Sequence, residues 1–138
     1  MAGNIGDFSR HFPVERLDHR QALKQLRPQL VVCSWMSLNL DLSETFRKAK
    51  FVHEYVLIGE VDYGVSGKPW ETWGVGGQRG AEPSYSQQGF DRIPLADLSL
   101  LQIARSDTPH VRFHSQTTVF RRTERGPNFV PPNTRQEL

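Results

Sequence analysis

Two short apolar runs separated by a helical pattern are the clearest feature of this 138-residue chain. Leu30–Cys33 and Tyr55–Ile58 are continuous rather than alternating in apolarity and contain β-branched residues. Such runs are typical of parallel strands that are covered on both faces. Between them, Asp41 and Glu44 have the spacing of a capping box, in which each side chain satisfies a free backbone N–H. The pattern predicts a strand–helix–strand unit over residues 30–60.

The residues between the two runs also have helical periodicity. One face of the predicted helix is formed by Leu42, Thr45, Phe46 and Ala49. Basic residues suit its last turn, where the helix dipole is negative: Arg47, Lys48 and Lys50.

Weaker patterns extend the domain in both directions. Upstream, Val14–Leu17 is a candidate strand, and Asp18 with Gln21 repeats the capping spacing for a helix that ends before Pro28. Downstream, leucines at near-helical spacing predict a helix over Ile93–Ala104.

The last predicted element is an antiparallel hairpin. Val111–His114 and Thr117–Phe120 read as two strands, with the turn at Ser115 and Gln116. The alternation of strands and helices predicts one α/β domain over 14–122, preceded by an extension, 1–13, and followed by a Pro- and Arg-containing tail, 123–138.

A long loop over 59–89 is the most unusual segment. It holds eight of the eleven glycines together with Trp70, Trp73 and Tyr85. Loops of this length usually act as lids or binding segments. Glu60 and Asp62 follow a strand, where ligands bind in open α/β sheets, so a pocket beneath a tryptophan is one reading, and solvated acids are the other. The Gly-rich stretch 74–80 does not follow a strand and lacks the last glycine of a dinucleotide-binding turn.

Composition narrows the chemistry. The five histidines and the single cysteine, Cys33, show no metal-ligand spacing and no pattern of covalent catalysis, so we assign no catalytic residue and no metal site. The chain has no apolar stretch long enough for a membrane span and its start lacks a signal-peptide core, which predicts an intracellular, non-secreted protein.

Charge is unevenly distributed. Residues 30–104 carry six basic and nine acidic side chains, whereas residues 105–138 carry six arginines and three acidic side chains. An arginine-rich end is able to contact nucleic-acid phosphate. We favour docking to a protein, because the tail after Arg121 and Arg122 contains three prolines and no periodicity and should not fold alone.

The order of elements resembles the later half of the class I, Rossmann-like S-adenosylmethionine-dependent methyltransferases, over residues 14–122. On this resemblance, Val14–Leu17 corresponds to the third strand, Leu30–Cys33 to the fourth, Tyr55–Ile58 to the fifth, and the hairpin to the last two. The segment from Ser34 to Gly74 is also similar to uncharacterised methyltransferase-like proteins. The first two strands and the Gly-rich cofactor turn have no counterpart, which predicts a partial Rossmann-like sheet.

Two functions follow from the resemblance. The first is a non-catalytic structural subunit, without a cofactor, that binds protein partners in a larger assembly. The second is half of a split methyltransferase, completed by another chain, in which S-adenosylmethionine would contact Asp18, Ser34, Trp35 and Glu60.

Both functions require a partner at one edge of the sheet. In the family the fourth strand lies beside the first, so without it Leu30–Cys33 becomes an open apolar edge that another chain is expected to pair with or cover. Aromatic, methionine and arginine side chains are enriched at interfaces. We therefore expect partner contacts at Trp35, Met36, Trp70, Trp73, Arg121 and Arg122.

Overall fold

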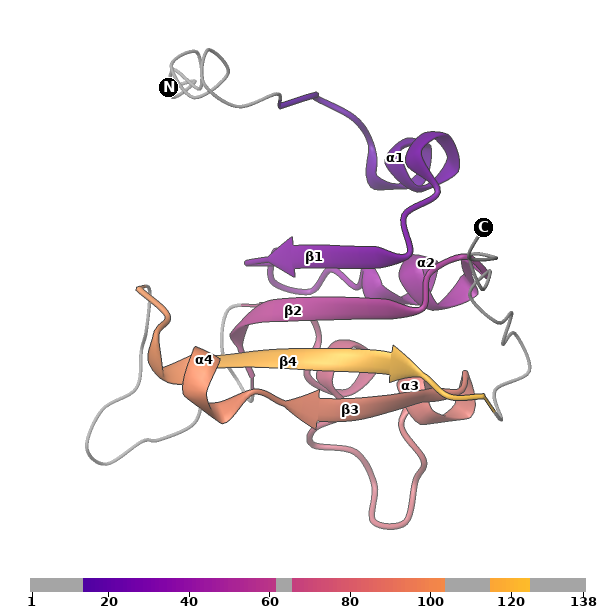
Figure 1. The fold of residues 1–138 in the computed structure, drawn as a ribbon. Coiled ribbons are helices and arrows are strands. Elements are labelled where there is room, and N and C mark those ends of the chain that lie inside the picture. The colour runs from indigo at the N-terminus through magenta and orange to yellow at the C-terminus, as the bar shows by residue number, and fades with distance from the viewer. Residues whose placement is uncertain (1–13, 62–65, 104–114, 125–138) are drawn as a thin grey trace, which may run out of the picture.

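A four-stranded mixed sheet organises the computed structural model, which describes residues 14–61, 66–103 and 115–124 (Figure 1). The strands are β1 (Leu30–Ser34), β2 (Glu54–Glu60), β3 (Phe90–Pro94) and β4 (Ser115–Arg122). Their order across the sheet is β1-β2-β4-β3. β1 runs parallel to β2, and β4 lies antiparallel between β2 and β3. The predicted α/β class, with a partly parallel open sheet, is confirmed.

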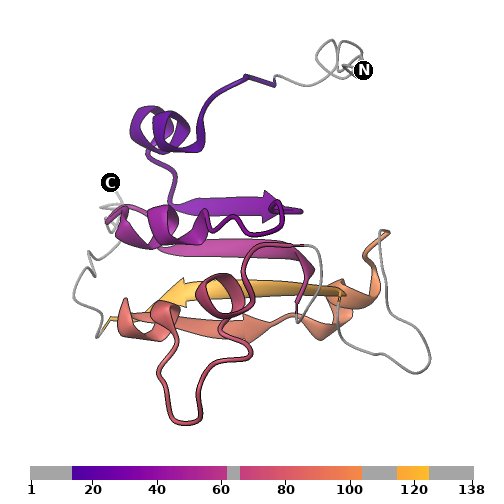
Figure 2. The ribbon, with the colours of Figure 1, turned by 180° about the vertical axis from the view of Figure 1, so that it is seen from behind.

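Helical segments cover the two faces of the sheet unequally. They are α1 (His19–Leu26), α2 (Ser43–Lys48), the π-helical turn η2 (Pro69–Trp73), α3 (Ser84–Gln87) and α4 (Ala96–Leu100). Figures 1 and 2 show α2, η2 and α3 on one face, which we call the helical face, and α4 on the other, which we call the open face. The parallel β1–α2–β2 unit is the predicted strand–helix–strand unit.

The core lies on the helical face, between the sheet and the helices that cover it. Its centre is Tyr55 of β2, which is fully buried and stacks on Phe120 of β4 with ring centroids 4.7 Å apart. Phe90 of β3 and Phe46 of α2 meet the same ring at 5.4 and 5.8 Å. Aromatic side chains bury large apolar areas, so this cluster joins three strands and a helix in one core.

The capping prediction for α1 is confirmed. Asp18 is the N-cap, and its carboxylate accepts a hydrogen bond from Arg20 N at 2.9 Å. The helix ends at Leu26, and Arg27 takes a left-handed conformation before Pro28.

The strand predicted at Val14–Leu17 is wrong. This segment has no regular structure, and Val14 is 61% exposed. A strand there would need an apolar neighbour, and charged Glu15 and Arg16 interrupt its two apolar positions. Consequently β1 has no strand beside it, on the side away from β2, among the described residues.

The prediction that both apolar runs are covered on both faces is wrong for β1. Leu30 and Val32 are 51% and 61% exposed, whereas Val31 and Cys33 are half-buried. The run is continuous in sequence, but only the side chains that point to the helical face are packed.

The predicted helix over Ile93–Ala104 is shorter and begins later. Ile93 and Pro94 pair with Val119 and Thr118 of β4, so α4 starts only at Ala96. Pro94 can end this strand because edge positions do not require every backbone N–H. Sheet pairing has overridden the helical spacing of the leucines.

The predicted hairpin turn is also wrong. Ser115 and Gln116 lie inside β4, where they pair with Glu60 and Gly59. Val111–His114, the other predicted strand, lies outside the described residues. β4 pairs instead with β3, a strand that was not predicted because its last residues were assigned to the helix over Ile93–Ala104.

Candidate functional site

The carboxyl ends of β1 and β2 bring three of the sequence-predicted site residues together. Ser34 is the register neighbour of Ile58, two residues before Glu60, and Trp35 N donates to Ile58 O at 2.8 Å. Glu60 is 9% exposed, while Ser34 lies on the surface. Asp18 stands apart on α1, where its hydrogen bond from Arg20 N lowers the pKa of its carboxyl group.

The helical side of this strand end is filled by the chain itself. A Cβ atom added at Gly59 would lie 2.5 Å from Ser66 Oγ and 3.6 Å from Trp73 Cζ2. Trp73 is 1% exposed, and its Nε1 donates to Ser66 O at 2.9 Å. The tryptophan therefore occupies the space beneath the end of β2 rather than covering it from outside.

Gly67 ties the segment after β1 to the segment that follows β2. Its N–H donates to Met36 O at 3.1 Å, and its carbonyl accepts from Asn39 N at 3.0 Å. Its φ of 70° is left-handed, and an added Cβ would lie 2.8 Å from Thr72 Oγ1. Glycine meets both requirements at this position, because it has no Cβ and no penalty for positive φ.

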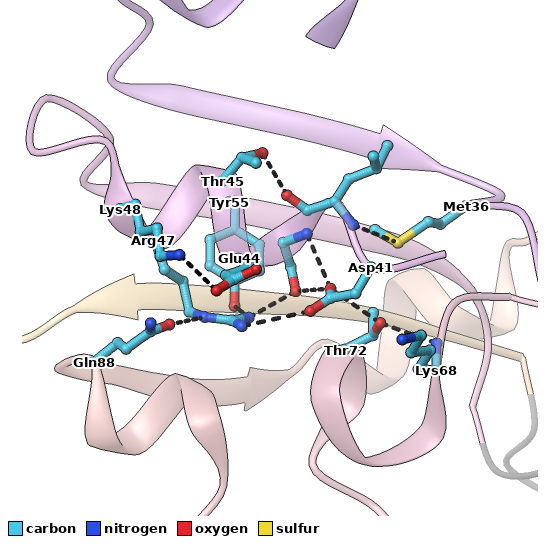
Figure 3. A network of polar contacts seen from close by, with 12 residues as sticks. Met36, Asp41, Glu44, Thr45, Arg47, Lys48, Tyr55, Lys68, Thr72 and Gln88 are labelled. Carbon is cyan, nitrogen blue, oxygen red and sulfur yellow. Dashed lines mark hydrogen bonds and ion pairs between the residues drawn. The ribbon is translucent and has the colours of Figure 1, made fainter. Parts of the chain in front are cut away.

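A buried polar network lies behind this turn (Figure 3). Asp41 Oδ1 accepts from the backbone N–H and hydroxyl of Ser43 and from Thr72 Oγ1, the last at 3.1 Å. Arg47 donates to Ser43 Oγ at 2.6 Å, to Tyr55 Oη at 3.3 Å and to Gln88 Oε1, and it pairs with Asp41 at 3.6 Å. The network joins α2 to β2, η2 and the end of α3.

The two central side chains of this network are buried. Arg47 is 1% exposed and Tyr55 is fully buried, so neither is open to a ligand. Burial raises the pKa of the Tyr55 hydroxyl, which holds it in the neutral form as a partner of Arg47. In the sequence, Arg47 lies in the basic last turn of the predicted helix, where an exposed side chain is expected. Its position next to Phe46 is the one sequence feature that points to the core.

The six expected partner contacts divide into buried and accessible side chains. Met36 and Trp73 belong to the core, and Met36 Sδ accepts from Leu42 N at 3.3 Å. Arg122 is 5% exposed and donates to Val52 O at 2.9 Å and to the carbonyls of the last turn of α2. A partner meets none of these three side chains at the surface.

The other three expected contacts remain accessible. Trp35 is 38% exposed and has a left-handed φ of 54°. Arg121 is exposed and pairs with Glu54 at 2.7 Å, and Trp70 is half-buried against Gly77.

The side chains at the ends of β1 and β2 differ in their exposure. Ser34 faces solvent, Glu60 is nearly covered, and the neighbouring space at Gly59 is occupied by Ser66 and Trp73. Within the described ranges there is no group of three or more His, Cys, Asp or Glu side chains that is able to hold a metal ion. Burial raises the pKa of Cys33, which keeps it a protonated thiol.

The exposed large apolar side chains lie on β1, in the segments before and after it, and on and after α4. They are Val14, Leu26, Leu30, Val32, Trp35, Leu38, Leu40, Leu98, Leu100, Leu101 and Ile103. None of the helices in the described part of the chain has the length and apolarity to cross a bilayer. The sequence identified the β1 segment as an edge, but it did not indicate the exposed leucines of α4.

No protein-family profile matches the chain, and no curated protein or solved structure matches it significantly.

Proposed function

We propose that this protein is a non-catalytic, methyltransferase-like subunit that binds other protein chains through the β1 edge of its sheet. One observation carries the proposal: β1 is an edge strand among the described residues, yet it carries neither a charged side chain nor a proline. Residues 28–40 contain no charged side chain, and Leu30 and Val32 are more than half exposed. Unprotected apolar edges invite strand pairing and are normally covered or charged in native proteins.

The strand order supports the methyltransferase-like part of the proposal. β1 and β2 run parallel, and β4 is antiparallel between β2 and β3. This is the order expected if these strands correspond to the last four strands of that family's sheet. The missing strands would then belong beside β1, the edge that has no neighbouring strand among the described residues.

The filled strand end supports the absence of catalysis. A subunit that has lost its cofactor has no need for an open space at the end of β2. Trp73 and Ser66 pack against Gly59 there, and the Arg47 network is closed to ligands.

The alternative is half of a split S-adenosylmethionine-dependent methyltransferase. It is favoured by the proximity of Ser34, Trp35 and Glu60 at the carboxyl ends of two parallel strands, where ligands bind in α/β sheets. A partner chain would have to supply the rest of the cofactor site, including the Gly-rich turn.

Calorimetric titration of S-adenosylmethionine separates the two functions. The titration is performed on the purified chain and on the complex that the tagged chain forms in its native source. We expect no heat of binding in either case, together with a stoichiometric complex that is lost with Val32→Lys. Binding by the complex alone would establish the split enzyme, and a complex unaffected by Val32→Lys would reject the edge as the binding surface.

A further inference from the structure

The free edge of β1 is self-complementary. Trp35 N donates to Ile58 O and Gln29 O accepts from Glu54 N, so the odd-numbered residues direct their backbone groups toward β2. Because backbone groups alternate along a strand, the N–H and C=O groups of Leu30, Val32 and Ser34 point to the free edge. Three residues at alternate positions, centred on Val32, thus present three donors and three acceptors.

We propose that a second copy of this chain pairs with this edge, β1 against β1 in antiparallel orientation, about a two-fold axis at Val32. The inference rests on the proposed function and names the partner of the same surface. In an antiparallel pair, directly opposed residues exchange both of their hydrogen bonds. Val32 then pairs with Val32 of the second copy, Leu30 pairs with Ser34, and all outward groups are satisfied in one register.

The side chains agree with this register. Leu30, Val32 and Ser34 all lie on the open face, so the pairing places the two Val32 side chains side by side across the axis. Since residues 28–40 carry no charge, no like charges meet at the junction. The result is one continuous eight-stranded sheet with β3 at each end, as the four-stranded order requires.

Exposed apolar side chains beyond β1 extend the contact. Antiparallel pairing sets the start of one β1 beside the end of the other. Leu26, which is 68% exposed just before β1, then approaches Trp35 and Leu38 of the second copy, which are 38% and 55% exposed. Figures 1 and 2 both show α1 beyond the β1 edge, next to the start of the strand. Five strand residues alone bury too little area for a stable dimer, and these side chains supply the remainder.

Sedimentation equilibrium of the full chain tests the pairing with variants that place a positive or a negative side chain at Val32. The unmodified protein is expected to dimerise at micromolar concentration, and both Val32→Lys and Val32→Asp to raise its Kd by about 10-fold, since each removes two facing valines and sets like charges on the axis. Mixing the two variants should restore a one-to-one dimer. Leu98→Lys on α4, which replaces a side chain as exposed as Leu30, should leave Kd unchanged. Circular dichroism melting shows that each variant remains folded.

Other outcomes overturn the inference. A protein that stays monomeric throughout the concentration range, or a dimer that survives both Val32 variants, rules out β1 pairing between copies. A dimer that is lost in the single variants but not restored by mixing them rules out the register centred on Val32. In the monomeric case the proposed function is judged separately, by whether Val32→Lys abolishes the complex formed in the native source.

Discussion

The two edge strands of the described sheet, β3 and β1, differ in the side chains that they expose. β3 carries an exposed Asp91, a half-buried Arg92 that bonds Gln116 at 3.0 Å, and an exposed Pro94 at its end. These are the charges and proline by which native edge strands resist pairing. β1 has neither: its exposed positions are Leu30, Val32 and Ser34.

A row of residues across the open face shows the same contrast. Asp91 of β3 is the register neighbour of Arg121, Arg121 faces Glu54, and Glu54 faces Leu30. Along this row the charge is negative, positive and negative on β3, β4 and β2, and the residue on β1 is uncharged. The difference is that, among the described residues, the β3 edge carries charged side chains and the β1 edge carries none.

The two edges can be compared only if the core keeps the sheet folded without a partner. Arg47→Ala tests that interior, because it leaves the Asp41 carboxylate without its buried cation and removes the donor to Tyr55. Removing one member of a buried ion pair typically costs about 3–5 kcal/mol, so a large loss in the free energy of unfolding is expected in urea denaturation. Lys48→Ala is the matched control, since its pair with Glu44 is exposed and should contribute less than about 1 kcal/mol. Equal losses in the two variants would show that the network does not hold the interior.

The open edge is tested most directly by Trp35→Ala. If this exposed tryptophan is a central anchor of the contact, the variant weakens association by about 2–4 kcal/mol, measured as Kd by sedimentation. Leu98→Ala removes an exposed apolar side chain of α4, away from β1, and should leave Kd unchanged. An unaltered Kd for Trp35→Ala would place the contact elsewhere on the chain.

The sequence predicted the parallel unit well because local signals agree there. Apolar runs bounded by turns and the N-cap residue Asp18 fix β1, β2 and α1 through nearby contacts. The capping box predicted at Asp41 and Glu44 is wrong, because the N-cap of α2 is Leu42, which makes no side-chain cap hydrogen bond. The same signals failed in residues 90–104, where the leucine spacing is helical but pairing with β4 gives Phe90–Pro94 to the sheet. Such pairing depends on residues about 30 positions away, which local periodicity does not record.

The candidate site was predicted only in part, for a similar reason. The register of β1 and β2 agrees with the expectation that Ser34, Trp35 and Glu60 lie at neighbouring strand ends, because carboxyl ends of parallel strands share one edge. Their role in binding stays a prediction. The burial of Arg47 and Arg122 was missed, because arginine is rarely enclosed. Their enclosure depends on distant hydrogen-bond acceptors, Gln88 for Arg47 and the carbonyls of 47–52 for Arg122.

The protection of β3 is tested by Asp91→Val, which removes the outermost charge of the row. The variant should gain self-association through β3, by about 1 kcal/mol or less, because a cross-strand charge contributes at this level. The measurement is the weight-average mass by light scattering, in a Val32→Lys background that keeps β1 apart. Ala96→Val, an exposed change just outside β3, serves as the control. A mass that remains that of a monomer would show that Asp91 does not protect this edge.

The smallest effect is expected where the charged row meets the open edge. Glu54 and Arg121 form an exposed pair at 2.7 Å across β2 and β4, one strand away from Leu30. A double-mutant cycle with Glu54→Ala and Arg121→Ala should give a coupling energy of about 0.2–1 kcal/mol in urea denaturation, and added salt should reduce it. If a second copy covers β1, Glu54 loses part of its exposure to water and the coupling becomes larger in the dimer than in the Val32→Lys background. An identical coupling in both backgrounds would mean that whatever covers β1 does not reach the second strand of the sheet.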